Sequence, residues 1–219
     1  MQVVAILSSK GGAGKTTLAL HLAVAAEKAG HASGVIDLAP EASAARWARL
    51  RLDGMSPVLS MSPSQLAEAL DLARGEGAGL VLIDTGSCSR DAACVAADAA
   101  DVLLIVCRPS CLDLRSIDGV AELAQKAGKQ SYVVLNVVPP RAAHVTADAR
   151  DAIAAHGLEV APITVQQRAV YTHALAAGQT AQEYEPAGKA ADEMAQLYAW
   201  LRRVLPATHA KPARGKRGA

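Results

Sequence analysis

One glycine-rich stretch constrains this chain more than any other feature. It reads Ser8-Ser9-Lys10-Gly11-Gly12-Ala13-Gly14-Lys15-Thr16-Thr17, and it follows the apolar run Val3–Leu7 and precedes an Ala- and Leu-rich segment over Leu18–Ala29. A strand, a glycine loop and a helix in this order predict a phosphate-binding loop. A glycine-rich turn of another α/β protein, such as one that binds dinucleotides, is the alternative, but GKT directly after a strand is a far narrower signal.

The residue types in this loop predict a nucleotide site. Glycines let backbone N–H groups turn inward around phosphate oxygens, and the helix that begins near Lys15 directs its positive end at them. Lys15 would contact the β- and γ-phosphates, Thr16 would bind Mg²⁺ and Thr17 would reach the α-phosphate. Ser9 replaces the glycine of the usual pattern and Lys10 is an additional lysine, so the loop is a deviant one. The candidate nucleotide-binding residues are Gly11, Gly12, Ala13, Gly14, Lys15, Thr16 and Thr17.

Apolar runs alternate with helical patterns along the rest of the chain. We expect strands over residues 32–37, 79–84, 102–106, 132–136 and 158–163, helices over residues 65–74, 91–99, 114–127 and 147–156, and a loop over residues 108–113. This alternation predicts an α/β fold with a mostly parallel twisted sheet and helices on both faces, the P-loop NTPase architecture. The chain has 219 residues, 51% of them hydrophobic, which suits a single domain over residues 1–205.

Polar side chains follow two of the predicted strands. Asp84 closes a near-continuous apolar run, as a Walker B aspartate does, and it would hold the hydration shell of Mg²⁺. The plainer interpretation of Asp84 is a strand-end acid, but its presence beside a phosphate loop favours the metal role. Asn136 ends its strand at the same edge of the sheet, where open α/β sheets bind ligands. It would either contact the nucleotide or cap the Pro139-Pro140 turn.

Composition places few further limits on function. The formal net charge of +1 does not indicate a nucleic-acid protein, but residues 206–219 form a basic segment that we expect to be disordered, with Lys211, Arg214, Lys216 and Arg217. The four cysteines, Cys88, Cys94, Cys107 and Cys111, lack a CxxC spacing and are interpreted as reduced thiols. No signal peptide precedes the first strand, so we expect a cytoplasmic protein.

The last helical pattern carries one apolar stripe. Its members are Met194, Leu197, Tyr198, Leu201, Val204 and Leu205. A helix that lies on a membrane surface usually interleaves basic residues with bulky apolar ones, but this helix has only Arg202 and Arg203. We therefore expect the stripe to pack in the core, and we expect no membrane partner.

The form KGGxGKT of the loop resembles the ParA/MinD family of deviant Walker A ATPases, in particular ParA-type partition ATPases that lack an N-terminal DNA-binding domain. The resemblance extends through Leu205, with Arg168, Tyr171 and Gly178 before an acidic position and the helix start at Pro186 and Lys189. It implies ATP and Mg²⁺ as cofactors and a homodimer that sandwiches two ATP molecules. In that family the additional lysine, here Lys10, reaches the partner subunit's ATP, and Asn136 would recognise adenine.

The resemblance also implies partners and a cellular role. The ATP-bound dimer would bind DNA without sequence preference, with Arg168, Lys189, Arg202 and Arg203 as candidates, and would associate with the nucleoid. A ParB-like adaptor would stimulate hydrolysis and release the dimer. Cycles of this kind segregate or position plasmids, chromosomes or other cargo.

Two positions depart from the family pattern. The pattern Asp-x-Asp-Pro, whose second aspartate orients the attacking water, is replaced by Asp37-Leu38-Ala39-Pro40. An alanine cannot accept a hydrogen bond from water, so we expect an ATP-trapped, hydrolysis-deficient form unless Asp37 or Glu41 supplies the lost function. Ala39 is either an introduced substitution or a natural divergence. Asp84-Thr85-Gly86 also lacks a proline that the family often has. The candidate catalytic residues are Lys10, Lys15, Asp37 and Ala39.

Three other functions remain open on the same fold. The first is an ATP-dependent biosynthetic synthase of the dethiobiotin or cobyrinic-acid type, although no additional substrate motif is apparent. The second is a MinD-like membrane-positioning ATPase. The third is a nitrogenase-iron-protein-like reductase, for which Cys88 and Cys111 are weak candidates as cluster ligands.

Overall fold

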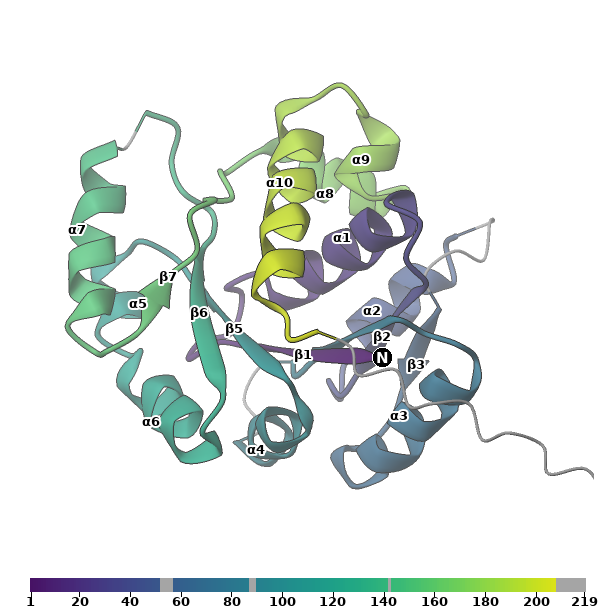
Figure 1. Cartoon of the computed structure of the whole chain (residues 1–219). Coiled ribbons are helices and arrows are strands. Elements are labelled where there is room, and N and C mark those ends of the chain that lie inside the picture. Colours follow the sequence, from purple (N-terminus) through teal and green to yellow (C-terminus); the bar gives the residue numbers. More distant parts are fainter. Residues whose placement is uncertain (52–56, 87–89, 142, 208–219) are drawn as a thin grey trace, which may run out of the picture.

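The computed structural model describes residues 1–51, 57–86, 90–141 and 143–207. Within these ranges seven parallel strands form one sheet in the order β3-β2-β4-β1-β5-β6-β7 (Figure 1). The strands are β1 Gln2–Leu7, β2 Ser33–Asp37, β3 Val58–Ser60, β4 Leu80–Asp84, β5 Val102–Cys107, β6 Gln130–Leu135 and β7 Glu159–Val160. The predicted parallel α/β sheet is confirmed, with β1 at its centre.

Helices cover both faces of the sheet. They are α1 Lys15–Lys28, α2 Ser43–Ala48, α3 Leu66–Gly75, α4 Arg90–Ala99, α5 Cys111–Leu114, α6 Asp118–Ala127, α7 Ala143–Ala154, α8 Ala169–Ala176, α9 Ala181–Tyr184 and α10 Lys189–Val204, with a 3-10 turn over Pro63–Gln65. Side chains alternate between the faces along β1, because successive residues of a strand point to opposite sides. Val4 and Ile6 join the core under α1 and α10, whereas Val3, Ala5 and Leu7 join the core under α3, α4 and α6.

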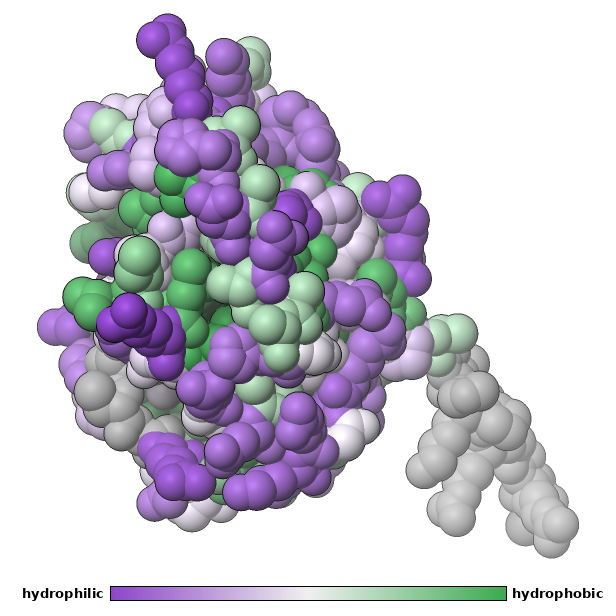
Figure 2. All heavy atoms as spheres, turned by 90° about the vertical axis from the view of Figure 1, so that its left-hand side faces the viewer, coloured by the Kyte–Doolittle hydropathy of each residue, from purple (hydrophilic) through white to green (hydrophobic). Residues whose placement is uncertain are grey.

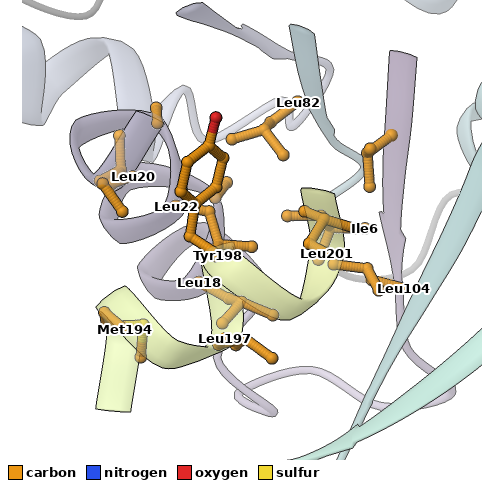
Figure 3. Packing of buried hydrophobic residues seen from close by; sticks show 14 of the residues in the cluster. Ile6, Leu18, Leu20, Leu22, Leu82, Leu104, Met194, Leu197, Tyr198 and Leu201 are labelled. Carbon is orange, nitrogen blue, oxygen red and sulfur yellow. The ribbon is translucent and has the colours of Figure 1, made fainter. Parts of the chain in front are cut away.

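The stripe of α10 packs in the core, as the sequence predicts. Met194, Leu197, Tyr198 and Leu201 are buried, and Figure 3 shows them against Leu18 and Leu22 of α1 and against the sheet residues Ile6, Leu82 and Leu104. Alanines along α1 are fully buried, and their small side chains allow α1 to lie between the sheet and α10. No helix of the described residues is long and apolar enough to cross a bilayer.

Three predicted boundaries were wrong. The helix expected over residues 114–127 is two helices, α5 and α6, so part of the expected loop over residues 108–113 is helical. The Ser110 side chain accepts a hydrogen bond from the N–H of Asp113 and starts α5, and the Ser116 hydroxyl donates to the Asp113 carbonyl after it. The strand expected over residues 158–163 is only β7, because Arg150 takes the carbonyl of Ala161 and Pro162 has no N–H to donate. The helix expected over residues 147–156 begins earlier and ends earlier, as α7.

Candidate nucleotide-binding site

The phosphate loop leaves the end of β1 and leads directly into α1. In Figure 1 β1 points to the left-hand side, and Figure 2 shows that side, with hydrophobic residues near the centre among hydrophilic ones. Gly14, with φ 101°, precedes α1, and no side chain caps the helix. The first N–H groups of α1 therefore point toward the loop without a capping side chain, as at other anion sites on helix N-termini.

Lys15 is held inside the loop. Its ammonium donates to the Ser8 hydroxyl at 2.7 Å, that hydroxyl donates to the Lys10 carbonyl at 2.7 Å, and Lys15 is only 6% exposed. Lys15, Thr16 and Thr17 line a cavity of about 350 Å³. Its other lining residues are Gly12, Gly14, Ala39, Glu41, Ser43 and Gly86. The structure thus brings the loop and the segments after β2 and β4 around one cavity.

Asp84 fits a magnesium site. It is fully buried beside Asp37, its partner in the sheet register. One carboxylate oxygen accepts the N–H of Gly86 at 3.3 Å, and the other, Oδ2, has no hydrogen-bond partner in the described part of the chain. Burial raises the pKa of Asp84, and the Thr16 hydroxyl opposes this shift. A divalent cation is the usual partner of such a carboxylate next to a threonine hydroxyl, so Thr16 and Asp84 suit Mg²⁺.

Asp37 shapes the loop after β2. Its carboxylate accepts the backbone N–H groups of Ala39, Ala44 and Ala45 at 3.0, 2.9 and 3.1 Å. These bonds cap α2 and fix the position of Ala39. Each oxygen of Asp37 therefore already accepts a backbone N–H, and Asp37 is fully buried and does not line the cavity.

The two departures from the family pattern face each other. Ala39 lines the cavity and is 6% exposed. A Cβ built on Gly86 would lie 2.6 Å from the Ala39 Cβ and 2.9 Å from its Cα, and Gly86 has φ 66°. Position 86 therefore requires glycine for both the close approach and the backbone angle. Glu41, the alternative carboxylate, is exposed and lines the same cavity.

Residues after β5 and β6 contact the loop from another side. The Arg108 guanidinium donates to the Gly12 carbonyl, and the Asn136 amide donates to the Ala13 carbonyl at 2.7 Å. Lys10 donates to the Leu112 carbonyl at 2.7 Å, so in this structure its ammonium is bound within its own chain. Recognition of adenine by Asn136 remains a prediction. Arg108 was not predicted as a site residue, although it follows β5 just as Asp84 closes β4 and Asn136 follows β6.

The four candidate DNA-binding residues are not gathered at one place. Arg168 forms an ion pair with Glu193 at 2.5 Å, which raises the pKa of Arg168, and Tyr171 donates to the same carboxylate. Lys189, Arg202 and Arg203 are exposed on α10. Because a helix advances about 1.5 Å and 100° per residue, Lys189 and Arg203 share a face about 21 Å apart, and Arg202 is turned about 100° away.

Arg202 lines a groove between α1 and α10. The groove has a volume of about 460 Å³, and Lys28 and His31 also line it. Lys28 is exposed at the end of α1. Lys28 was not predicted as a site residue, because only the packing of α1 against α10 brings it near Arg202.

The cysteines differ in exposure. Cys107 is buried, which raises its pKa to about 11, Cys94 is partly buried and Cys111 is exposed. Cys88 lies outside the described residues, as do Lys211, Arg214, Lys216 and Arg217 of the basic segment. Among the residues that are described, no group of three or more His, Cys, Asp or Glu side chains is placed to hold a metal ion.

Comparisons with known proteins agree with this geometry. The chain is 28% identical over 212 residues to the maintenance of carboxysome distribution protein A of Halothiobacillus neapolitanus, covering 93% of this chain and 96% of the relative. Two solved structures share the fold. One is MinD of Pyrococcus horikoshii complexed with Mg-ADP, with a TM-score of 0.73, 19% identity and 91% and 95% of the two chains covered.

The other solved structure is an ATP complex of Cyanothece McdA in which an aspartate is replaced by alanine. It has a TM-score of 0.69 and 18% identity, and 92% of this chain and 96% of that chain are covered. The family model described as the CobQ/CobB/MinD/ParA nucleotide binding domain matches residues 4–181. The chain therefore belongs to the CobQ/CobB/MinD/ParA nucleotide-binding domain family.

Proposed function

We propose that this protein is a ParA-like ATPase that dimerises with ATP and positions a large cargo on DNA. The observation that carries the proposal is the cavity in which Lys15, Thr16 and the segments after β2 and β4 meet. Beside it lies Asp84, whose Oδ2 has no hydrogen-bond partner among the described residues. The relative named for carboxysome distribution supports a protein assembly as cargo, and a plasmid or chromosome is the other class.

The loop would hold the triphosphate of ATP. Its backbone N–H groups and Lys15 would bind the β- and γ-phosphates, and Thr17 would reach the α-phosphate. Thr16 and Asp84 would hold Mg²⁺, which neutralises charge on the phosphates when it is bound. The Asn136 amide donates to the Ala13 carbonyl through one N–H, and its second N–H and its oxygen would face adenine.

Lys10 would couple ATP to dimerisation. Its bond to the Leu112 carbonyl joins a cation to a neutral acceptor. A phosphate of the partner's ATP is a charged acceptor, so Lys10 would gain the attraction between two opposite charges in addition to a hydrogen bond. Lys10 would therefore leave Leu112 for the partner's nucleotide, and two ATP molecules would lie between the subunits.

Hydrolysis would be slow in this chain. Ala39 has no acceptor for the attacking water, and the oxygens of Asp37 bind backbone N–H groups. Orientation of water by a general base contributes about a hundredfold or more to such reactions. The ATP-bound dimer would consequently persist, and a ParB-like adaptor would be needed to release it.

DNA would bind along the exposed bases of α10. Lys189 and Arg203 share one face, whereas Arg202 and Lys28 flank the groove between α1 and α10. Arg168 would contribute less, because Glu193 already neutralises its charge. Contacts of this kind carry no sequence preference, and they would bring the dimer to the nucleoid.

The proposal is tested by co-sedimentation with DNA and by sizing, with ATP, with ADP and without nucleotide, at two salt concentrations. We expect a dimer only with ATP, and DNA binding that falls with salt by a log–log slope of roughly −0.9 per neutralised phosphate. The variant Arg202→Ala/Arg203→Ala should lose DNA but keep the dimer. Arg74→Ala is the matched control, because Arg74 is also exposed on a helix and lies on the opposite face of the sheet, in α3.

Two results would contradict the proposal. A protein that stays monomeric and ignores DNA with ATP bound would not be a ParA-like ATPase, and phosphorylation of an added carboxylate would then favour the biosynthetic alternative. Binding to anionic liposomes with ATP, without DNA binding, would favour the MinD-like alternative.

A further inference from the structure

Two side chains behind the phosphate loop hold consecutive peptide groups of that loop. Arg108 donates to the carbonyl of Gly12, and Asn136 donates to the carbonyl of Ala13 at 2.7 Å. The cavity is lined by Gly12, Gly14 and Lys15, whereas neither Arg108 nor Asn136 is among its lining residues. Both side chains therefore contact the loop without lining the cavity.

Because of the geometry of the peptide bond, these two contacts also set the direction of the backbone N–H groups that follow. In a planar trans peptide the C=O and the following N–H point in opposite directions. A carbonyl of Gly12 that is held by Arg108 directs the N–H of Ala13 away from Arg108. A carbonyl of Ala13 that is held by Asn136 directs the N–H of Gly14 away from Asn136. Successive N–H groups that converge in this way form an anion-binding concavity, or nest.

The backbone angles of the loop agree with such a nest. Gly12 has φ 72° and Gly14 has φ 101°, with Ala13 between them at only 2% exposure. A Cβ on Gly14 would lie 2.2 Å from the Asn136 amide nitrogen. The asparagine thus lies directly against the loop, where only glycine leaves room for it.

The sheet register explains why these two residues act together. Cys107 of β5 and Leu135 of β6 are register partners, so the next residues, Arg108 and Asn136, leave neighbouring strands side by side. The N–H of Asn136 donates to the Cys107 carbonyl at 2.8 Å, which fixes the start of this segment. Neighbouring strands lie about 4.8 Å apart, a spacing that suits two consecutive carbonyls of one loop.

We propose that Arg108 and Asn136 are positioning residues that pre-orient the N–H groups of Ala13 and Gly14 for the phosphates of the nucleotide. This inference rests on the proposed ATP binding and adds a role for Arg108. Asn136 is 6% exposed, and the Nε of Arg108 is buried with no hydrogen-bond partner in the described ranges. Burial of these polar groups has a cost, which the orientation of the loop offsets in the bound state.

The test measures the affinity for Mg-ATP and for magnesium tripolyphosphate, which has the phosphates but no adenine. Arg108→Ala and Asn136→Ala should each weaken both ligands by about tenfold, because each loses one hydrogen bond that orders the site. Arg108→Lys should recover most of the loss. Arg150→Ala is the matched control, because Arg150 also donates to a backbone carbonyl, that of Ala161, but far from the loop.

The outcomes separate the role of loop orientation from other roles. If Asn136→Ala weakens ATP but leaves tripolyphosphate unchanged, Asn136 recognises adenine and the inference is wrong for it. If the loss in Arg108→Ala disappears at high salt, Arg108 acts only by long-range attraction, since salt screens such attraction and not local orientation. If the unchanged chain binds neither ligand, the proposed function fails first. Thermal unfolding of each variant shows whether it is folded.

Discussion

The two halves of the candidate site differ in the groups that they leave for a ligand. At the ends of β1, β5 and β6 the carbonyls of Gly12 and Ala13 and the ammonium groups of Lys10 and Lys15 have partners within the chain, although the buried Nε of Arg108 has none in the described residues. At the ends of β2 and β4 the carboxylate of Asp37 has partners, whereas the Oδ2 of Asp84 has none in the described residues. The first half is therefore held by contacts within the chain, and the second half offers a carboxylate oxygen to a ligand.

In the proposed function this difference would separate nucleotide binding from hydrolysis. A pre-oriented loop binds phosphates without a large cost of ordering, so nucleotide affinity would depend mainly on the first half. Hydrolysis would need a metal and a correctly placed water, which would lie in the second half, where Ala39 stands at the position of the family's water-orienting aspartate. Variants in each half should therefore change the two properties separately.

The largest effect is expected from restoring the carboxylate. Ala39→Asp should raise the rate of ATP hydrolysis by about a hundredfold or more and leave the affinity for ATP within about threefold, because it adds a water acceptor to the cavity and changes no loop contact. Single-turnover hydrolysis and nucleotide titration measure the two quantities. Ala39→Asn is the control, since it has nearly the same size but no charge. Equal rates in this chain and in Ala39→Asp would show that Glu41 or another group already serves as the acceptor.

The stability of the first half should depend on a neutral His21. The Nδ1–H donates to the Thr17 carbonyl at 2.7 Å, and Nε2 accepts the N–H of Ala181 at 3.0 Å, so α1 and α9 are joined. Burial lowers the pKa of His21 to about 4, although the Thr17 carbonyl and Glu183 oppose the shift. The unfolded chain takes up this proton near its ordinary value of 6.5. The contribution of neutral His21 to the free energy of unfolding is therefore fully present above pH 6.5. It falls by roughly 3 kcal/mol as the pH drops to about 4.

Urea unfolding between pH 4 and pH 8 measures this dependence. Carboxylates also titrate in this range, so the unchanged chain is compared with His21→Gln. The variant should lack the part of the pH-dependent drop in free energy of unfolding that is assigned to His21. His144→Gln, at an exposed position of α7, should keep it. Identical pH profiles for all three proteins would contradict the assignment.

The loop after β2 should depend on Asp37. Asp37→Asn leaves one acceptor oxygen for three backbone N–H groups, so we expect a loss of roughly 2 kcal/mol in the free energy of unfolding. For a chain of this size the melting temperature should fall by about 4–8 °C. Asp101→Asn is the comparison, because the exposed Asp101 accepts the N–H of Val3 alone among the described residues, and its loss should be smaller. Equal losses in the two variants would mean that the three hydrogen bonds of Asp37 contribute no more stability than the bond between Asp101 and Val3.

The smallest effect has the opposite sign. Asp84→Asn should stabilise the nucleotide-free protein by about 1 kcal/mol, because it removes a buried charge whose Oδ2 has no hydrogen-bond partner in the described chain. The same variant should lose the magnesium dependence of ATP binding. Thermal unfolding without ligand and titration with and without Mg²⁺ measure the two effects. A destabilised variant would show that the carboxylate is satisfied without a metal.

Much of the fold and part of the site followed from local pattern. The strand, loop and helix order around Lys15 and the acid after a buried run at Asp84 depend on neighbours in the chain, so both were predicted correctly as elements. The predicted helix boundaries near Ser110 and Ser116 were wrong because side-chain hydrogen bonds of these two serines decide them. Arg108 and Lys28 were missed because their contacts join segments far apart in the sequence.

The sequence alone determined the strand, glycine loop and helix around Lys15, the parallel α/β sheet and the alanine at position 39, since each is a matter of residue type and short-range order. The tertiary structure decided which side chains hold that loop. Arg108, Asn136 and His21 have no distinctive sequence context. Their hydrogen bonds depend on the order β1-β5-β6 in the sheet and on the packing of α9 against α1. Periodicity shows which face of an element is buried, whereas the register between distant elements shows which polar groups meet.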